Sequence, residues 1–229
     1  GAVARGRVDC ARDRDAVDAR GHDPRADAAQ IADELHVDAR ARESGRPSED
    51  DARRGTLGRS LAVEQYGAGP YGTQLMSELG AEVIKIEAPS MGGDVSRATG
   101  PYFLGEGDSQ FFQTFSRGKK SVSLEIKSPE GRAAFERLVA SADAVVNNVR
   151  GDQPEKLRIT YDHLKAINPK IVCAHLSAYG RDNSRATWPG YDYLMQAEAG
   201  FMTMTGEPDG PPVRFGLSMV DFMTGSMFA

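Results

Sequence analysis

Short apolar runs alternate with amphipathic segments from about residue 57 onward. Runs of about four to eight residues that are rich in Val and Ile, with turn residues at both ends, are typical of buried strands. The pattern predicts five strands: SLAVEQY (60–66), AEVIKIE (81–87), KKSVSLEI (119–126), DAVVNNV (143–149) and KIVCAHLSAYG (170–180).

Three amphipathic segments predict helices. The first, GPYGTQLMSELG (69–80), has Pro70 in its first turn and Gly80 at its end, where these residue types favour helix boundaries. The others are SPEGRAAFERLVASA (128–142) and TYDHLKAIN (160–168). Alternating strands and helices predict an α/β fold: a doubly wound, mostly parallel, Rossmann-like sheet with helices on both faces.

Residues 1–56 differ in composition from residues 57–229. They contain 11 Arg and 10 Asp, but no Lys, Phe, Tyr or Trp. So few large apolar groups cannot offset the entropy of ordering the chain. We therefore expect a disordered or atypical N-terminal extension, with at most a short helix at 27–41. An alternative is that this stretch is GC-rich DNA translated out of frame, and we place no function there.

Length, charge and cysteine content narrow the class of protein. The chain has 229 residues and a net charge of −5, which gives no reason to expect nucleic acid. No run approaches the roughly 20 apolar residues of a membrane span, and no secretion signal is evident. The two cysteines and four histidines lack metal-ligand spacing. We expect a cytoplasmic enzyme domain that binds neither metal nor membrane.

A glycine motif after the first predicted strand carries the first candidate chemistry. G-x-G-x-x-G at 67–72, with Glu87 at the end of the next strand, matches a dinucleotide fingerprint. Pro70 removes one backbone N–H from this loop and Tyr71 is bulky, which counts against a bound pyrophosphate. A dinucleotide site, a site for another anion and a plain turn stay open on this segment alone.

Two further segments place polar groups near predicted strand ends. Arg117, Lys119 and Lys120 precede a strand and could hold phosphates, although a solvated turn is the commoner role of such a cluster. Asn147 and Asn148 end another strand, where ligands of open α/β sheets gather, or they simply terminate it.

Together these motifs resemble the class III CoA-transferase family (CaiB/BaiF type), which includes formyl-CoA transferase, carnitine CoA-transferase and α-methylacyl-CoA racemase. The resemblance runs from about Leu61 to the last residue. It rests on AGPYGTQLMSELGAEVIKIEAP, FFQTFSRGKKSVSLEIKSPEGRAAFERLVASADAVVNNVRG, INPKIVCAHLSAYG and GYDYLMQAEAGFMTMTGEPDGPPVRFGLSMVDFMTG. It implies that residues 57–229 are the N-terminal part of a large domain, truncated before a small domain. It also implies an interlocked homodimer at full length.

The resemblance implies two catalytic residues. Asp221 matches the aspartate that forms a covalent intermediate, and Tyr191 matches a residue placed against the acyl group. Related racemases have a histidine at the latter position. A tyrosine, with an ordinary pKa of roughly 10, is a poor acid/base partner near neutrality and favours transfer. Without the resemblance, Asp221 would be interpreted as a helix N-cap.

The resemblance also implies a path for coenzyme A. Its residues in this chain are Gly67, Ala68, Gly69, Lys119, Asn148, Val149 and Arg158. Arg158 is the expected phosphate contact, because its planar guanidinium suits that group. Two positions depart from relatives: Ala88 cannot hold a phosphate, and Val149 replaces a frequent aromatic residue.

The function that the resemblance implies is transfer of coenzyme A between an acyl-CoA and a carboxylic acid, and we expect no permanently bound cofactor. The alternatives are an acyl-CoA racemase or isomerase, or a catalytically incomplete CoA-binding fragment. An NAD-dependent oxidoreductase is a more distant alternative.

Overall fold

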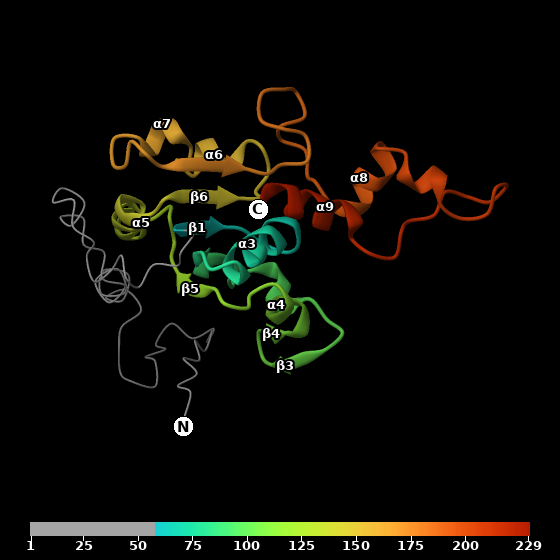
Figure 1. Cartoon of the computed structure of the whole chain (residues 1–229), viewed down its shortest axis with the longest axis horizontal. Helices are drawn as coiled ribbons and strands as arrows, with labels where there is room; N and C mark the ends of the chain where they lie inside the picture. The colour runs from blue at the N-terminus through green and yellow to red at the C-terminus, as the bar shows by residue number, and fades with distance from the viewer. Residues whose placement is uncertain (1–57) are drawn as a thin grey trace.

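The computed structural model describes residues 58–229, so the expectations for residues 1–56 lie outside the described part of the chain. Five strands form the main sheet, and each coincides with a segment that the apolar pattern predicts, although β1 begins one residue before the predicted run at 60–66 (Figure 1). They are β1 (Arg59–Val63), β2 (Glu82–Glu87), β5 (Lys120–Ser123), β6 (Ala144–Asn147) and β7 (Val172–His175). The last is shorter than the predicted run at 170–180, since the chain turns away after His175.

All pairings in this sheet are parallel, with the order β5-β2-β1-β6-β7. Numbered along the chain, the strands lie in the order 3-2-1-4-5, the Rossmann arrangement. Val63 of β1 is in register with Asn147 of β6, so both strands end at the same level. The predicted α/β fold is confirmed, and the strand order reverses between β1 and β6.

Helices cover both faces of the sheet. On one face, α5 (Pro129–Ser141) packs on alternate residues of the strands, among them Leu61, Ile84 and Val145. On the other face lie α3 (Ala68–Glu78) and α9 (Met219–Phe228), against a smaller cluster that includes Ala62 and Val83. Gly80 after α3 has a φ of 108°, as its predicted role at the helix end requires.

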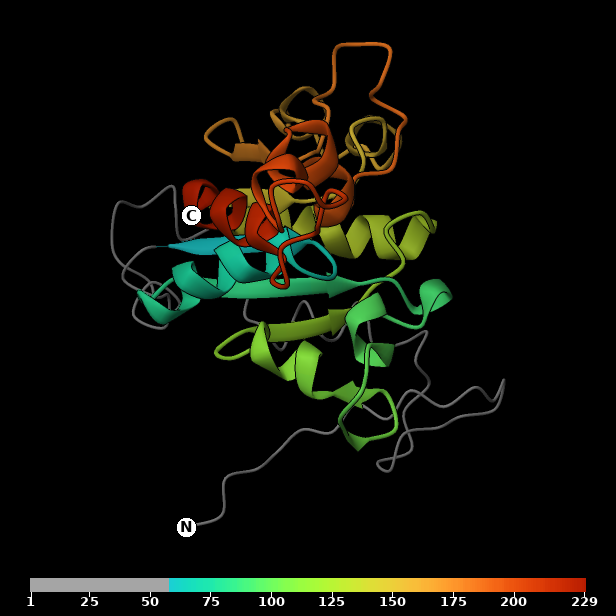
Figure 2. The same ribbon diagram turned by 90° about the vertical axis from the view of Figure 1, so that its right-hand side faces the viewer.

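The close approach of α3 and α9 depends on two glycines. A Cβ on Gly72 would lie 2.7 Å from the carbonyl oxygen of Gly225, and one on Gly225 would lie 2.6 Å from that of Ala68. Figure 2 shows α9 lying along α3, next to the strands. The last described helix is therefore held beside the turn that follows β1.

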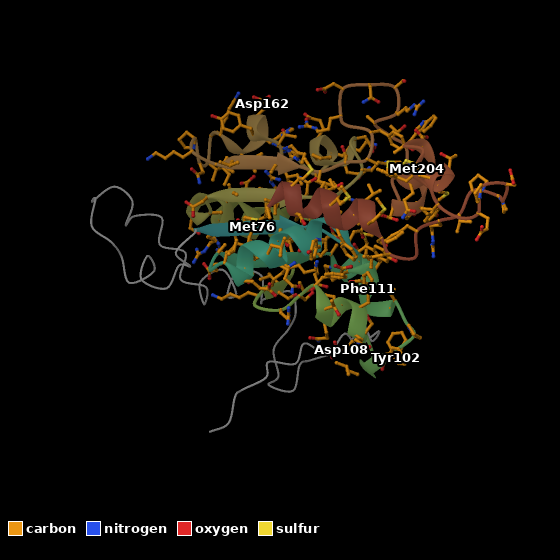
Figure 3. The ribbon with its side chains drawn as sticks, turned by 45° about the vertical axis from the view of Figure 1, so that its right-hand side comes forward. Met76, Tyr102, Asp108, Phe111, Asp162 and Met204 are labelled. Carbon is orange, nitrogen blue, oxygen red and sulfur yellow. The ribbon has the colours of Figure 1, made fainter. Side chains whose placement is uncertain are left out.

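Smaller elements surround this layered core. The hairpin of β3 (Phe103–Gly105) and β4 (Asp108–Ser109) with α4 (Gln110–Thr114) forms one lobe, where Tyr102, Asp108 and Phe111 are seen in Figure 3. The others are α6 (Gln153–Lys156), α7 (Tyr161–Leu164), α8 (Asp192–Glu198) and the 3-10 helices Pro89–Met91, Val95–Ala98 and Phe201–Met204. None of the helices in residues 58–229 is long and apolar enough to cross a membrane.

Candidate active site

The site lies where the strand order reverses. Asn148 follows β6, and its side chain forms two hydrogen bonds to the backbone of Gln65 after β1. Its Oδ1 accepts from the Gln65 N–H at 2.9 Å, and its Nδ2 donates to the Gln65 carbonyl at 2.7 Å. Gly69 packs against the same amide, with no room for a Cβ. The asparagine thus fixes the turn at 65–69, in the crevice where open α/β sheets bind ligands.

Asp221 faces this turn from α9. A Cβ on Gly67 would lie only 2.5 Å from Oδ2 of Asp221, so the absence of a side chain lets the carboxylate approach the backbone. Asp221 is not the N-cap of α9: the cap is Ser218, and Asp221 is the third helical residue. The carboxylate is therefore not required to begin the helix.

The environment of Asp221 changes its acidity. Burial first, and then the negative charge of Asp192, raise the pKa of the Asp221 carboxyl to about 6. Among residues 58–229 no Lys, Arg or His forms an ion pair with it. An ionised carboxylate at pH 7 that is more basic than an ordinary aspartate suits nucleophilic attack.

A cavity of about 920 Å³ lies beside this carboxylate. It brings together five of the residues that the sequence predicts: Ala68, Asn148, Val149, Tyr191 and Asp221. Gly67 and Gly69 contact two of these lining residues from the turn. Tyr191 is half-exposed at the start of α8, and its ring stacks on Tyr193 with 5.6 Å between centroids.

A second cavity, of about 290 Å³, adjoins the first and shares three lining residues with it, including Lys127. Four cations line it, and no carboxylate does: Lys127, Arg132, Lys156 and Arg158. Only Arg158 is among the predicted residues. The signal for two others was the run IKSPEGR (126–132), where Lys and Arg flank the start of α5.

Lys119, predicted to lie on the CoA path, is buried among protein groups. Its ammonium donates to the carboxylate of Glu64 at 2.8 Å, to Thr73 Oγ1 at 2.7 Å and to the Pro70 carbonyl at 2.8 Å. The side chain is 1% exposed, and burial lowers the pKa of its ammonium despite the attraction of Glu64. Lys119 lines neither cavity, and its hydrogen bonds hold the start of α3.

The sequence profile of CoA-transferase family III matches residues 59–229. The chain belongs to CoA-transferase family III. The succinate–glutarate CoA-transferase of Agrobacterium fabrum is 39% identical to it over 172 residues, which cover 73% of this chain and 43% of that protein. The acetyl-CoA:oxalate CoA-transferase of Acetobacter aceti is 40% identical over 160 residues, covering 70% and 40%.

Solved structures agree with this membership. A CaiB/BaiF family protein from Brucella suis has a TM-score of 0.70 and 34% identity, over 76% of this chain and 47% of that one. A hypothetical protein from Mycobacterium tuberculosis has a TM-score of 0.66 and 35% identity, over 74% and 46%. The chain thus spans less than half the length of these family III relatives.

In this family III chain, Glu87, the acidic residue of the dinucleotide fingerprint, is already hydrogen-bonded to other groups of the protein. The Glu87 carboxylate accepts hydrogen bonds from Arg97 at 2.7 and 2.8 Å, from Ser121 and from the Asp94 N–H. Burial alone would raise its pKa, but these bonds hold the pKa of Glu87 below its ordinary value. Such a carboxylate has little capacity left for a ribose hydroxyl. No cluster of three or more possible metal ligands occurs within residues 58–229.

We expect Lys119→Met to lower the free energy of unfolding by about 2 kcal/mol, because it leaves the Glu64 carboxylate partly unpaired in the core. The effect is smaller than for a lone buried pair, since Lys85 and Thr73 also contact Glu64. Lys120→Met is the matched control, because Lys120 is the next residue and its side chain is 54% exposed. We expect it to change the free energy of unfolding by less than about 1 kcal/mol. Urea unfolding measures both, and equal effects would contradict the buried role of Lys119.

Proposed function

We propose that the protein containing this chain transfers coenzyme A between an acyl-CoA and a carboxylic acid, through a covalent intermediate on Asp221. One observation carries the proposal. The half-buried carboxylate of Asp221 lies against the Gly67 turn and lines the large cavity where the strand order reverses. Its raised pKa of about 6 leaves it largely ionised at neutral pH.

The chemistry follows from a carboxylate nucleophile. Asp221 attacks the thioester carbonyl of the donor, the C–S bond breaks, and a mixed anhydride and CoA thiolate form. The thiolate attacks the aspartyl carbonyl, which gives an aspartyl thioester and frees the donor acid as a carboxylate. The acceptor carboxylate then repeats these two steps in reverse order. The new acyl-CoA leaves, Asp221 is regenerated, and no oxidant or further reactant is needed.

Each carbonyl attack creates an oxyanion, and the turn supplies donors for it. Ala68 and Gly69 open α3, so their N–H groups have no acceptor within the helix. They lie beside Gly67, which touches the Asp221 carboxylate. Backbone N–H groups fixed in advance are well suited to stabilise such a charge. We assign Ala68 and Gly69 this role.

The basic cavity fits the phosphates of coenzyme A. Lys127 and Arg158 are exposed, and within residues 58–229 neither side chain has a hydrogen-bond or ion-pair partner. Lys156 and Arg132, in contrast, already bind Asp152 and Glu136. We place the phosphates at Lys127 and Arg158, with the rest of coenzyme A passing Asn148 and Val149 toward Asp221.

We expect Lys127→Ala and Arg158→Ala each to weaken CoA binding by about tenfold, the loss of one charge-assisted hydrogen bond. Calorimetric titration with CoA and with dephospho-CoA measures this. Lys170→Ala is the control, because Lys170 lies outside both cavities. Unchanged affinity in both cavity variants would show that the phosphates bind elsewhere.

The names of the relatives guide the choice of acids. They include transferases for glutarate, oxalate and mesaconate. We therefore propose a dicarboxylic acid as acceptor. The test mixes the complete gene product with succinyl-CoA and each acid, and mass spectrometry follows new CoA thioesters. A new thioester is the expected result; deuterium uptake from D2O into a 2-methylacyl-CoA without transfer would indicate a racemase instead.

The interlocked homodimer stays a prediction, which sedimentation of the same material tests.

A further inference from the structure

The N-terminus of α9 is capped by a residue from another helix. Asp192, the first residue of α8, is 8% exposed, and its Oδ1 accepts the N–H groups of Val220 at 2.8 Å and of Asp221 at 3.1 Å. Ser218, the local N-cap, makes no side-chain cap bond. Two N–H groups in the first turn of α9, those of Val220 and Asp221, are thus satisfied by Asp192, across 28 and 29 positions of sequence.

Gln196 fixes this carboxylate in place. It lies one turn after Asp192 on α8 and is fully buried. Its Nε2 donates to the other oxygen of Asp192 and, at 3.3 Å, to the Leu217 carbonyl, while its Oε1 accepts the Phe215 N–H at 2.9 Å. The segment before α9 and the first turn of α9 are both tied to α8 by this pair.

We propose that Asp192, locked by Gln196, is a positioning residue for Asp221: it fixes the first turn of α9 so that the Asp221 carboxylate meets the Gly67 turn. The proposal rests on the proposed function, in which Asp221 is the nucleophile. Helix capping alone would need only a side-chain oxygen, and asparagine caps as well as aspartate. The acid adds a negative charge beside Asp221. Burial first, and then this charge, raise the pKa of the Asp221 carboxyl.

Other charges near α9 are compensated. The helix packs on α3 and α8, whose titratable residues are Tyr71, Glu78, Asp192, Tyr193 and Glu198. Glu78 and Glu198 each pair with an arginine at 2.7 and 2.8 Å, and Glu64 on the cavity wall pairs with Lys119. Asp192 has no cationic partner within residues 58–229, so its charge is the one that acts on Asp221.

The test titrates Asp221 in this chain by carbon-13 NMR of the aspartate carboxyl carbons, with Asp221→Asn to assign the signal. Asp192→Asn keeps a capping oxygen but removes the charge. We expect the Asp221 midpoint to fall by at least about half a pH unit. The new side-chain NH2 faces the Nε2 donor of Gln196, so Tm should fall by roughly 5 °C while the protein stays folded. Asp162→Asn, on α7 and paired with Lys165, is the control and should leave the midpoint unchanged.

Two further substitutions at Asp192 separate its charge from its role as a helix cap. Asp192→Ser, a neutral cap, should give the same fall if Asp192→Asn does not fold. Asp192→Ala removes the cap as well, and hydrogen exchange at Val220 and Asp221 should accelerate about tenfold. Unchanged hydrogen exchange at Val220 and Asp221 in Asp192→Ala would overturn the positioning role, and an unchanged Asp221 midpoint in a folded neutral variant would overturn the role of the charge. The titration needs no turnover, so absence of CoA transfer with the expected midpoints would defeat only the proposed function.

Discussion

Asp221→Asn is expected to lower the rate of CoA transfer by at least about a thousandfold, because the amide cannot form the mixed anhydride. CoA affinity should change little, since the phosphates are assigned to Lys127 and Arg158, away from this carboxylate. Transfer between succinyl-CoA and a dicarboxylic acid measures the rate, and calorimetry measures the affinity. Asp209→Asn, an exposed change outside both cavities, serves as control and should retain full activity.

Stability distinguishes loss of chemistry from loss of fold. The folded pKa of Asp221, about 6, is above the ordinary value for aspartate. Its contribution to stability is therefore fully present below about pH 4 and is lost as the pH rises through about 6. At pH 8 the neutral asparagine should raise the free energy of unfolding by about 1 kcal/mol, a value reduced for partial solvent exposure. A destabilised Asp221→Asn protein would contradict this expectation.

Gly67→Ala is expected to reduce transfer by roughly a hundredfold to a thousandfold with little effect on stability. The new Cβ would lie 2.5 Å from Oδ2 of Asp221, which is the free end of a short side chain. The carboxylate can rotate away at small energetic cost, so the fold survives. A shift of about 1 Å in a reacting atom is enough for a loss near a hundredfold.

The control for this substitution is Gly105→Ala. A Cβ there meets nothing within 4 Å, and Gly105 is not among the glycines with positive φ. Transfer kinetics and thermal unfolding are compared for both variants. Full activity of Gly67→Ala would show that contact between the turn and Asp221 does not matter for the reaction. Loss of folding in Gly67→Ala alone would assign the glycine to structure.

The layered sheet could be predicted from sequence because its signals are local. Val- and Ile-rich runs such as AEVIKIE (81–87) are buried on both faces, and each predicted helix contains its own boundary residues. The predicted helix at 160–168 is shorter in the structure, as α7 spans only Tyr161–Leu164. The β3–β4 hairpin was not predicted, since its strands are only three and two residues long.

The parts of the site that depend on distant contacts could not be predicted. Lys119 resembles a free cation in the run SRGKK (116–120), and only the fold brings the Glu64 carboxylate to it across 55 positions. The role of Asp192 is hidden for the same reason, because the helix that it caps begins far along the chain. Gly67 and Asn148, in contrast, are candidates from the glycine motif and the strand end, and Asp221 is a candidate from the family resemblance. The structure brings these three residues together around one turn.

Capture of the covalent intermediate on Asp221 would show directly that this carboxylate is the nucleophile. The complete gene product is incubated with succinyl-CoA, treated with hydroxylamine or borohydride, digested and analysed by peptide mass spectrometry. We predict a modification at Asp221 that requires the acyl-CoA and that is absent from the Asp221→Asn protein. An unmodified Asp221 in material that actively transfers CoA would contradict the proposed mechanism.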